Sequence, residues 1–291
     1  MQKDDRIKYF VLERNDGISN NTNAIVSKVC GDYIVLCDHD DLLHVQALQA
    51  NAWVIQNEQA EVIYSDEDHL SVQGKHIAPF YKPDWSPDLL RSQMYTCHLF
   101  VFQKALFEEA GGFRSEYDGS QDYDLMLRFS EITTKICHIP LILYSWRECE
   151  TSTAANAAAK PYAHMAGKKA LDDHLKRCIG KGAYAADTDY TFVFDARYPI
   201  PENEPMVSII IPMKDQYILS KQCVESIIEK STYSNYEILI LNNRSEQKET
   251  FEWFKDVQKK YSNICVLDAD FEFNWSKLNN FGIRHAKGEI Y

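Results

Sequence analysis

Short apolar segments alternate with helix-like segments along most of this 291-residue chain. The apolar segments have the composition of buried strands, and the segments between them have the spacing of amphipathic helices. We expect strands at 7–12, 33–37, 61–64, 136–146, 207–211, 237–241 and 264–267. We expect helices at 20–29, 42–57, 104–110, 121–133, 160–178, 217–230, 248–260 and 278–286, and an irregular stretch at 65–96. This alternation predicts an α/β fold with a mostly parallel sheet and helices on both faces.

The composition excludes several classes of protein. A net charge of −12 argues against a nucleic-acid-binding protein, which usually presents a basic face. No apolar stretch is long enough to span a bilayer, and the first residues lack the apolar core of a signal peptide. The eight cysteines form no CxxC pair, so neither a zinc site nor a disulfide framework is indicated. We expect a cytoplasmic protein, either free or peripheral to the inner face of the membrane.

A break in the pattern divides the chain into two parts. Residues 199–205 contain three prolines in seven positions, which neither a helix nor a strand can accommodate. An apolar strand at 207–211 follows directly. We therefore expect one domain part at 1–186, a linker at 187–204 and a second domain part at 205–291.

The end of the chain repeats its beginning at an offset of 257 residues (264 − 7). Ile7, Ser19, Asn23 and Gly31 then align, in this order, with Ile264, Ser276, Asn280 and Gly288. The order of strand, loop, helix, Gly-acid pair and strand recurs as well. Such a repeat predicts that the chain holds the back of one domain and the front of the next.

The two parts would each leave open, apolar sheet edges, which favour association. We expect residues 207–267 to complete the sheet that 7–64 begin. This would happen by circular permutation within one chain or by exchange of halves in a homo-oligomer. One copy of the repeated segment would then be displaced or frayed.

Residues 38–41, Asp-His-Asp-Asp, directly follow the strand at 33–37. In open α/β sheets, ligands bind at the carboxyl ends of the strands. Carboxylates crowded there repel one another unless a cation lies among them, and hard divalent cations share oxygen ligands with substrate phosphates. This pattern favours a metal–diphosphate site. An acidic start of the helix at 42–57 is the alternative, because Asp caps helices and stabilises their first turn.

Six segments in a characteristic order resemble the family-2 glycosyltransferases of bacterial cell-surface polysaccharide synthesis, which have the GT-A fold. The segments are 207–212 and 237–245 for the first two strands, 15–23 before the metal motif, 38–41 for the DXD motif, 64–68 with 82–87, 119–128, and 138–147. The resemblance covers nearly the whole chain. It implies tandem GT-A domains and transfer of a hexose from a nucleoside-diphosphate sugar to a saccharide or lipid-linked saccharide acceptor.

The resemblance also implies roles for particular residues. Asp40 and Asp38 would bind Mn²⁺ or Mg²⁺, and Asp122 would be the catalytic base of an inverting transfer. The donor nucleotide would contact Asp38, Asn23, Gly17, Asp215, Asn242 and Asn243. The acceptor would contact Asp66, Asp68, Trp85 and Arg128. Each assignment has a structural alternative: a helix cap for Asp122, a loop-capping pair for Asp66 and Asp68, core packing for Trp85, and an exposed helix position for Arg128.

Two positions depart from the family pattern. Many relatives have a metal-binding histidine where this chain has Ser145, so His138 or His98 would have to replace it, or water would fill the gap. The family usually has Asp at Asn242, and Asn brings no charge to the nucleotide. A sugar nucleotidyltransferase is a second interpretation, although residues 212–216 are not the glycine-rich loop that it needs. A non-catalytic or incomplete nucleotide-sugar-binding fragment is a third.

Overall fold

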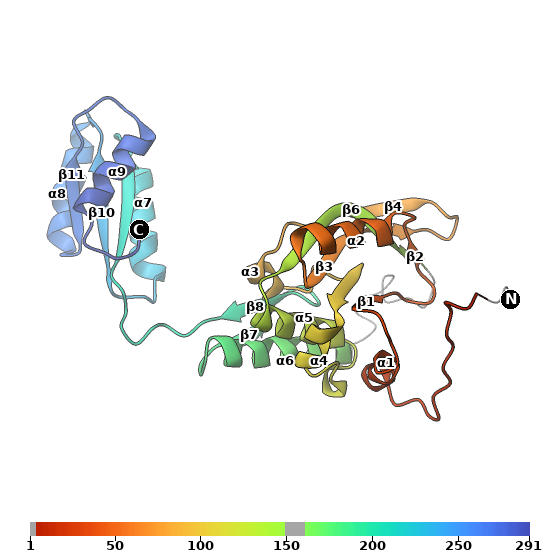
Figure 1. Ribbon diagram of the computed structural model, residues 1–291. Helices are drawn as coiled ribbons and strands as arrows, with labels where there is room; N and C mark the ends of the chain where they lie inside the picture. Colours follow the sequence, from red (N-terminus) through yellow and green to blue (C-terminus); the bar gives the residue numbers. More distant parts are fainter. Residues whose placement is uncertain (1–3, 149–160) are drawn as a thin grey trace. The chain divides into compact units, whose positions relative to one another are not determined.

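The computed structural model describes residues 4–148 and 161–291. The chain divides into two compact units, Met1–Pro199 and Ile200–Tyr291. Figure 1 shows both units, each with its own sheet and helices. The boundary falls inside the predicted linker. None of the helices in the described ranges is both long and apolar enough to cross a bilayer.

The first unit is built on a six-stranded sheet in the order β1-β5-β3-β6-β2, with β4 paired to β3. The strands are β1 Tyr33–Leu36, β2 Leu42–Leu43, β3 Val62–Leu70, β4 His76–Phe80, β5 Phe100–Gln103 and β6 Ile136–Arg147. β3 and β6 are parallel, whereas the other ladders are antiparallel. The sheet of this unit is therefore mixed. β1, β3 and β6 nevertheless run in one direction, which brings their carboxyl ends to the same edge.

Helices cover both faces of this sheet (Figure 1). The helices are α1 Ile18–Val26, α2 Ala47–Glu58, α3 Pro87–Leu90, α4 Lys104–Glu109, η1 Ser115–Tyr117, α5 Gln121–Ile132 and α6 Pro161–Cys178. Neighbouring strand residues point to opposite faces. Accordingly, Ile63 packs with Val54 of α2, while Tyr64 packs in a second core with Leu125 of α5 and Leu171 of α6. A hairpin of β7 Tyr184–Asp187 and β8 Phe194–Arg197 completes the unit.

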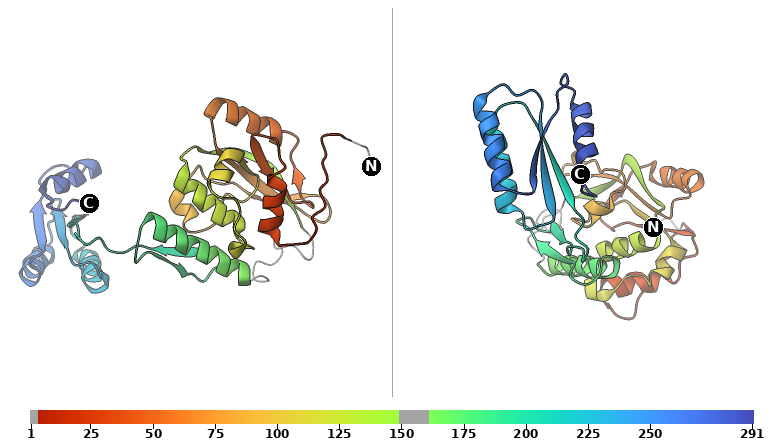
Figure 2. Two further views of the ribbon diagram at one scale, coloured as in Figure 1. Left: turned by 60° about the horizontal axis from the view of Figure 1, so that its bottom comes forward. Right: turned by 90° about the vertical axis from the view of Figure 1, so that its left-hand side faces the viewer.

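The second unit is a parallel three-stranded sheet in the order β11-β10-β9. Its elements are β9 Val207–Met213, α7 Tyr217–Lys230, β10 Tyr236–Asn242, α8 Lys248–Lys260, β11 Ile264–Asp268 and α9 Trp275–His285. Ile238 and Ile240 face α7 and α8, and the alternate residue Leu239 faces α9. Figure 2 shows the strands lying between these helices. Together with the helix-covered sheet of the first unit, this confirms the α/β fold.

Two sequence predictions fail in the first half of the chain. Residues 7–12 form no strand, and Ile7, Tyr9 and Val11 are 76%, 88% and 78% exposed. A strand needs a neighbour for its backbone groups, and within the described residues this segment has none. The helix predicted at 42–57 begins only at Ala47, because Leu42 and Leu43 pair with β6 as β2.

Two further segments are more regular than predicted. The irregular stretch at 65–96 contains the end of β3, all of β4 and the short helix α3. The predicted linker at 187–204 contains β8. The completion of one sheet by residues 207–267 and 7–64 stays a prediction.

Candidate active site

Tyr144 on β6 organises the acidic turn that follows β1. Its hydroxyl donates to Asp41 Oδ2 at 2.6 Å and accepts a hydrogen bond from the Asp38 amide at 3.1 Å. The amide of Arg147 donates to Asp41 Oδ1 at 2.8 Å, and its Nε donates to the Asp40 carbonyl. Asp41 therefore uses both carboxylate oxygens to attach the turn to β6. Its role is structural.

The carboxylates of Asp38 and Asp40 each lie near a histidine: Asp38 Oδ2 is 3.9 Å from His98 Nε2, and Asp40 Oδ1 is 3.7 Å from His39 Nδ1. Their side chains are 58% and 44% exposed, and within residues 4–148 and 161–291 neither carboxylate accepts a hydrogen bond. Oxygen donors of this kind fit a hard divalent cation, and the cation would relieve the repulsion between them. The fold thus bonds the carboxylate of Asp41, whereas the carboxylates of Asp38 and Asp40, the two aspartates named by the resemblance, accept no hydrogen bond from the described residues.

Asp122 lies in the first turn of α5, after Gly119 and Ser120. Gly119 has φ +96°, and a Cβ there would come within 2.9 Å of Ala163 Cβ, so glycine lets the chain pass close to α6. Burial raises the pKa of the Asp122 carboxyl above its usual range, and the negative charge of Asp38 acts in the same direction. The charge of His98 opposes both effects. His98 Nε2 is 3.9 Å from Asp38 Oδ2.

A buried ion pair holds the segment that carries His98. Lys82 Nζ lies 3.0 Å from Glu67 Oε2 and donates to the carbonyl of Thr96 at 2.8 Å. The same ammonium donates to the carbonyl of His98, and the His98 amide donates to Glu67 Oε2 at 3.2 Å. Neither Lys82 nor Glu67 was predicted from the sequence, since both lie in the stretch expected to be irregular. The presence of Lys82 at the start of the 82–87 motif was the only signal.

Ser145 lies in a different environment from Asp38. It pairs with Asp68 across β3 and β6, and its Oγ is 3.4 Å from His76 Nδ1. Asp68 Oδ2 is 2.8 Å from the same nitrogen, and Asp68 Oδ1 is buried without a hydrogen-bond partner. These residues line a cavity of about 410 Å³ together with Leu42 and its neighbours. Because neighbouring residues of a strand point to opposite faces, Ser145 points away from the face of Tyr144.

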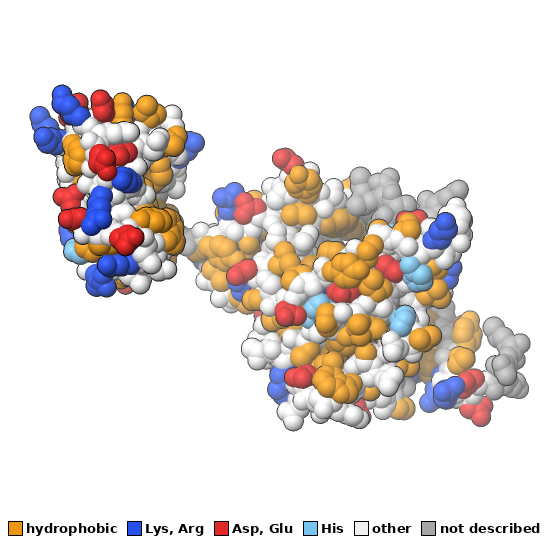
Figure 3. Space-filling model, turned by 90° about the horizontal axis from the view of Figure 1, so that it is seen from above, with side chains coloured by type: hydrophobic (Ala, Val, Ile, Leu, Met, Phe, Trp, Pro, Cys, Tyr) orange, Lys and Arg blue, Asp and Glu red, His pale blue; other side chains and the backbone are white. Residues whose placement is uncertain are grey.

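Asp66 and Trp85 lie near a larger cavity of about 840 Å³, of which Asp38, Asp40 and Asp122 are not lining residues. His138 and Trp85 line it, with Trp53 of α2. Asp66 is buried and bonds His138 Nε2 at 2.9 Å and the Lys82 amide at 2.8 Å. Figure 3 views the first unit from the side of α2, where hydrophobic side chains recur between acidic and histidine side chains. The acceptor roles of Asp66, Asp68 and Trp85 stay predictions.

Two other predicted residues have structural contacts. Asn23 exchanges two hydrogen bonds with the backbone of Phe113, at 2.8 and 2.9 Å. Gly17 packs against the carboxylate of Asp118, which accepts a bond from the Ser19 amide at 3.3 Å. These contacts attach α1 to the rest of the unit, and the nucleotide contacts of Asn23 and Gly17 stay predictions.

Arg128 is not an exposed helix residue, as the structural alternative assumed. It is buried, bonds Asp124 Oδ2 at 2.7 Å and donates to the carbonyl of Gly112 at 2.8 Å. Arg114 pairs with the same carboxylate. With its donors directed to this network, Arg128 fixes the loop after α4 onto α5, and the geometry does not favour contact with an acceptor.

The second unit gathers polar side chains at the carboxyl ends of its strands. Asp215 Oδ1 accepts hydrogen bonds from the amides of Glu246 and Gln247, both at 2.9 Å, and these bonds lower the pKa of Asp215. Asn242 donates to Asp268 at 2.8 Å, and Asn243 donates to the carbonyl of Ala269 at 2.8 Å. The three residues brace neighbouring loops, and their contacts with a nucleotide stay predictions.

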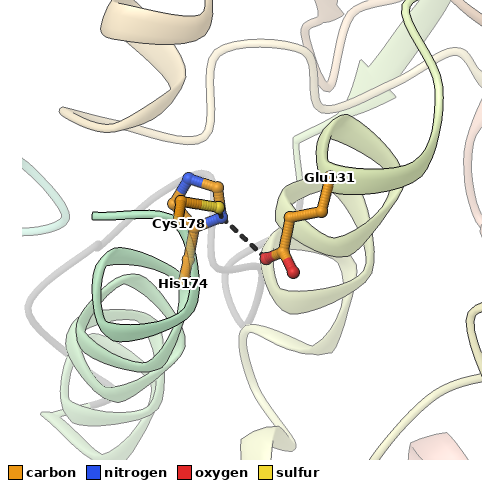
Figure 4. Close-up of side chains that lie close together, drawn as sticks. All are labelled: Glu131, His174 and Cys178. Atoms are coloured by element: carbon orange, nitrogen blue, oxygen red, sulfur yellow. Dashed lines mark hydrogen bonds and ion pairs between the residues drawn. The ribbon is translucent and has the colours of Figure 1, made fainter. Parts of the chain in front are cut away.

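A third cluster contains Glu131, His174 and Cys178, whose donor atoms lie within 4.8 Å of one another (Figure 4). Its chemistry does not fit a metal ion. Both oxygens of Glu131 accept bonds from Arg177, and His174 Nδ1 is 2.8 Å from Glu131 Oε1. Burial raises the pKa of the Cys178 thiol, which disfavours the thiolate that a metal needs. The cluster is an ion-pair network between α5 and α6.

Comparisons with known proteins identify the family. The sequence model of glycosyl transferase family 2 matches residues 1–110 and 208–291. The chain therefore belongs to glycosyl transferase family 2.

Two curated relatives match nearly the whole chain. The chain is 39% identical to the uncharacterized protein y4gI of Sinorhizobium fredii, over 99% of this chain and 32% of that protein. It is 36% identical to the O-antigen biosynthesis protein RfbC of Myxococcus xanthus, over 99% of this chain and 22% of that protein. This chain thus spans about a third of the length of y4gI and about a fifth of the length of RfbC. The structure of S. aureus TarS in complex with UDP-GlcNAc matches 57% of this chain and 49% of that chain, with 14% identity and a TM-score of 0.44.

Proposed function

We propose that this chain carries the catalytic part of a metal-dependent, inverting glycosyltransferase. It would transfer a sugar from a nucleoside-diphosphate sugar to a saccharide or lipid-linked saccharide acceptor, in the cytoplasm, during cell-surface polysaccharide synthesis. The observation that carries this proposal is the acidic turn after β1, where the exposed carboxylates of Asp38 and Asp40 accept no hydrogen bond from the described residues. The name of the RfbC relative, an O-antigen biosynthesis protein, supports the polysaccharide class.

Asp38 and Asp40 would hold Mn²⁺ or Mg²⁺, because their carboxylates are exposed and accept no hydrogen bond in the described ranges. The bound cation would neutralise the charge that develops on the leaving diphosphate. Tyr144 and Arg147 attach the turn that carries both aspartates to β6. A turn fixed in this way would support a preorganised site.

Asp122 would accept the proton of the acceptor hydroxyl as that oxygen attacks the anomeric carbon. A base works best when its pKa lies near the working pH, and burial moves the pKa of Asp122 upward. The charge of His98 opposes this rise. Such a base contributes on the order of 10²–10⁴-fold to the rate.

The experiment is release of nucleoside diphosphate from a panel of UDP-, GDP- and TDP-sugars in the presence of Mn²⁺, with calorimetry of donor binding. Asp122→Asn should bind donor and lose most turnover. Asp40→Asn should lose the Mn²⁺-dependent part of donor binding. Asp88→Asn is the matched control, because Asp88 is 86% exposed and its carboxylate pairs with Arg91.

Full turnover by Asp122→Asn would exclude Asp122 as the base. Unchanged metal-dependent affinity in Asp40→Asn would exclude the metal site. Donor binding without turnover by the unmodified chain would instead support the non-catalytic binding fragment.

A further inference from the structure

We propose that the cavity of about 410 Å³ beside β2 binds a neutral hexose unit of the saccharide acceptor. The choice of a saccharide rests on the proposed function. The preference for a neutral sugar follows from the residues that line the cavity. Asp38, Asp40 and Asp122 are not among them, so the bound unit would be one that does not react.

Three strands bring an acceptor, a hydroxyl and an apolar side chain into one row. Ser145 on β6 pairs with Asp68 of β3 on one side and with Leu42 of β2 on the other. Residues that pair across a sheet point to the same face, and all three line the cavity. Ligand pockets typically combine apolar surface with a few polar groups that fix the orientation of the ligand. The row provides both.

One carboxylate oxygen of Asp68 has no partner within the fold. His76 Nδ1 lies 2.8 Å from Asp68 Oδ2, whereas Oδ1 is buried and has no hydrogen-bond partner among the described residues. A buried acceptor without a donor costs free energy, which a leucine of similar shape would avoid. A ligand hydroxyl that donates to Oδ1 would remove this cost.

The hydroxyl of Ser145 is also available to a ligand. Its Oγ is 3.4 Å from His76 Nδ1, which is long for a hydrogen bond, and Asp68 Oδ2 lies closer to the same nitrogen. A serine hydroxyl can both donate and accept. Two adjacent hydroxyls of a hexose would therefore bond Asp68 and Ser145, and the C–H surface of the ring would pack on Leu42 and Ile142, which also line the cavity.

The lining residues do not suit a charged ligand. They include the carboxylate of Asp68 and two histidines, His44 and His76, but no lysine or arginine. A phosphate or a uronic acid would bring a second negative charge beside Asp68 without a permanent cation to neutralise it. A metal ion does not fit either, because no third His, Cys, Asp or Glu of the described residues joins Asp68 and His76 within 4.8 Å. A neutral sugar fits this set of groups best.

The cavity begins beside the acidic turn. Leu42 directly follows Asp41, whose carboxylate bonds the hydroxyl of Tyr144. Consecutive Cα atoms are about 3.8 Å apart. A hexose unit bound at Leu42 would therefore keep the acceptor chain next to the turn that carries Asp38 and Asp40.

The test is saturation-transfer NMR on the 291-residue chain with the methyl glycosides of glucose, galactose, mannose and rhamnose, and with methyl glucuronide as the acidic counterpart. At least one neutral glycoside should receive saturation, and the glucuronide should not. Asp68→Asn should weaken binding about tenfold, because a charge-assisted hydrogen bond becomes a neutral one. Ser145→Ala should weaken it several-fold. Asp84→Asn is the matched control, because Asp84 also pairs with a histidine, His138, but lines the larger cavity.

Each contrary result overturns the proposal in a different way. No saturation of any neutral glycoside, with or without Mn²⁺ and UDP, would mean that the cavity holds only water, and the turnover assay would still decide the proposed function. Equal binding of the glucuronide would contradict the preference for a neutral sugar. Binding that Asp84→Asn removes and Asp68→Asn retains would assign the sugar to the larger cavity. If Asp68→Asn does not fold, Ser145→Ala decides, and unchanged affinity in that variant would overturn the proposal.

Discussion

The ammonium of Lys82 lies 3.0 Å from the carboxylate of Glu67, and both side chains are buried, at 0% and 9% exposure. The pair connects β3 to the backbone of Thr96 and His98. It therefore couples the stability of the first unit to the position of the imidazole near Asp38. A buried charge is costly alone, so each member depends on the other.

Lys82→Met should destabilise the protein by about 3–5 kcal/mol, because Glu67 would be left as a buried, unpaired charge. Denaturant unfolding of the full chain measures this. The double variant Lys82→Met/Glu67→Gln removes both charges and should recover part of the loss. A single variant as stable as the unmodified protein would show that the pair does not support the fold.

Asp122→Asn should leave the unfolding temperature at pH 7 unchanged or higher. Burial raises the pKa of Asp122 in the folded state, so ionisation above that pKa costs folding free energy. The unmodified protein should gain stability from this group as pH falls through the raised pKa. Turnover should fall over the same range, at a higher pH than an ordinary aspartate would give. A clearly lower unfolding temperature for Asp122→Asn would contradict the raised pKa of Asp122 in the folded state.

Glu131 should contribute stability that depends on pH. Burial alone would raise the pKa of Glu131, but hydrogen bonds from His174 and Arg177 outweigh it and lower the pKa to about 2. The contribution is therefore complete above about pH 5 and is lost as pH falls toward 2. Glu131→Gln should cost about 1–2 kcal/mol at pH 7, allowing for solvent screening, and nothing near pH 2. An equal cost at both pH values would contradict the ion-pair assignment.

Gly17→Ala should destabilise the attachment of α1. Gly17 has φ +91°, and a Cβ there would lie 2.7 Å from Asp118 Oδ2. Gly74→Ala is the control, because Gly74 has φ +77° and no heavy atom within 4 Å of the added carbon. Both variants strain the backbone, by about 1 kcal/mol, and only Gly17→Ala also displaces Asp118. Equal unfolding free energies for the two variants would exclude that contact as a stabilising one.

The sequence predicts elements well where local pattern decides them. The bounds predicted for α7 and α8 agree with the structure, because each helix has an apolar face and polar ends. The other elements depend on partners that are distant in sequence. Asp66, Glu67 and Asp68 looked like a polar loop, yet they form a buried strand in which each carboxylate has a partner at one or more oxygens: Lys82, His138 or His76.

The candidate site likewise contains residues that a local pattern predicts and residues whose placement depends on distant partners. Asp38 and Asp40 can be predicted from their place after an apolar strand. The approach of His98 to Asp38 cannot, because it depends on how the Lys82–Glu67 pair places segments that are far apart in sequence. Residues 7–12 show the opposite outcome. Their apolar pattern predicts a strand, but none of the described residues pairs with this segment.

The most direct test of the account is an anomalous difference map from crystals of this chain soaked with MnCl₂ and a nucleoside diphosphate. The account predicts one strong manganese peak within coordination distance of the carboxylates of Asp38 and Asp40. A map with manganese only at Glu131, His174 and Cys178, or with no peak beside Asp38 and Asp40, would contradict it.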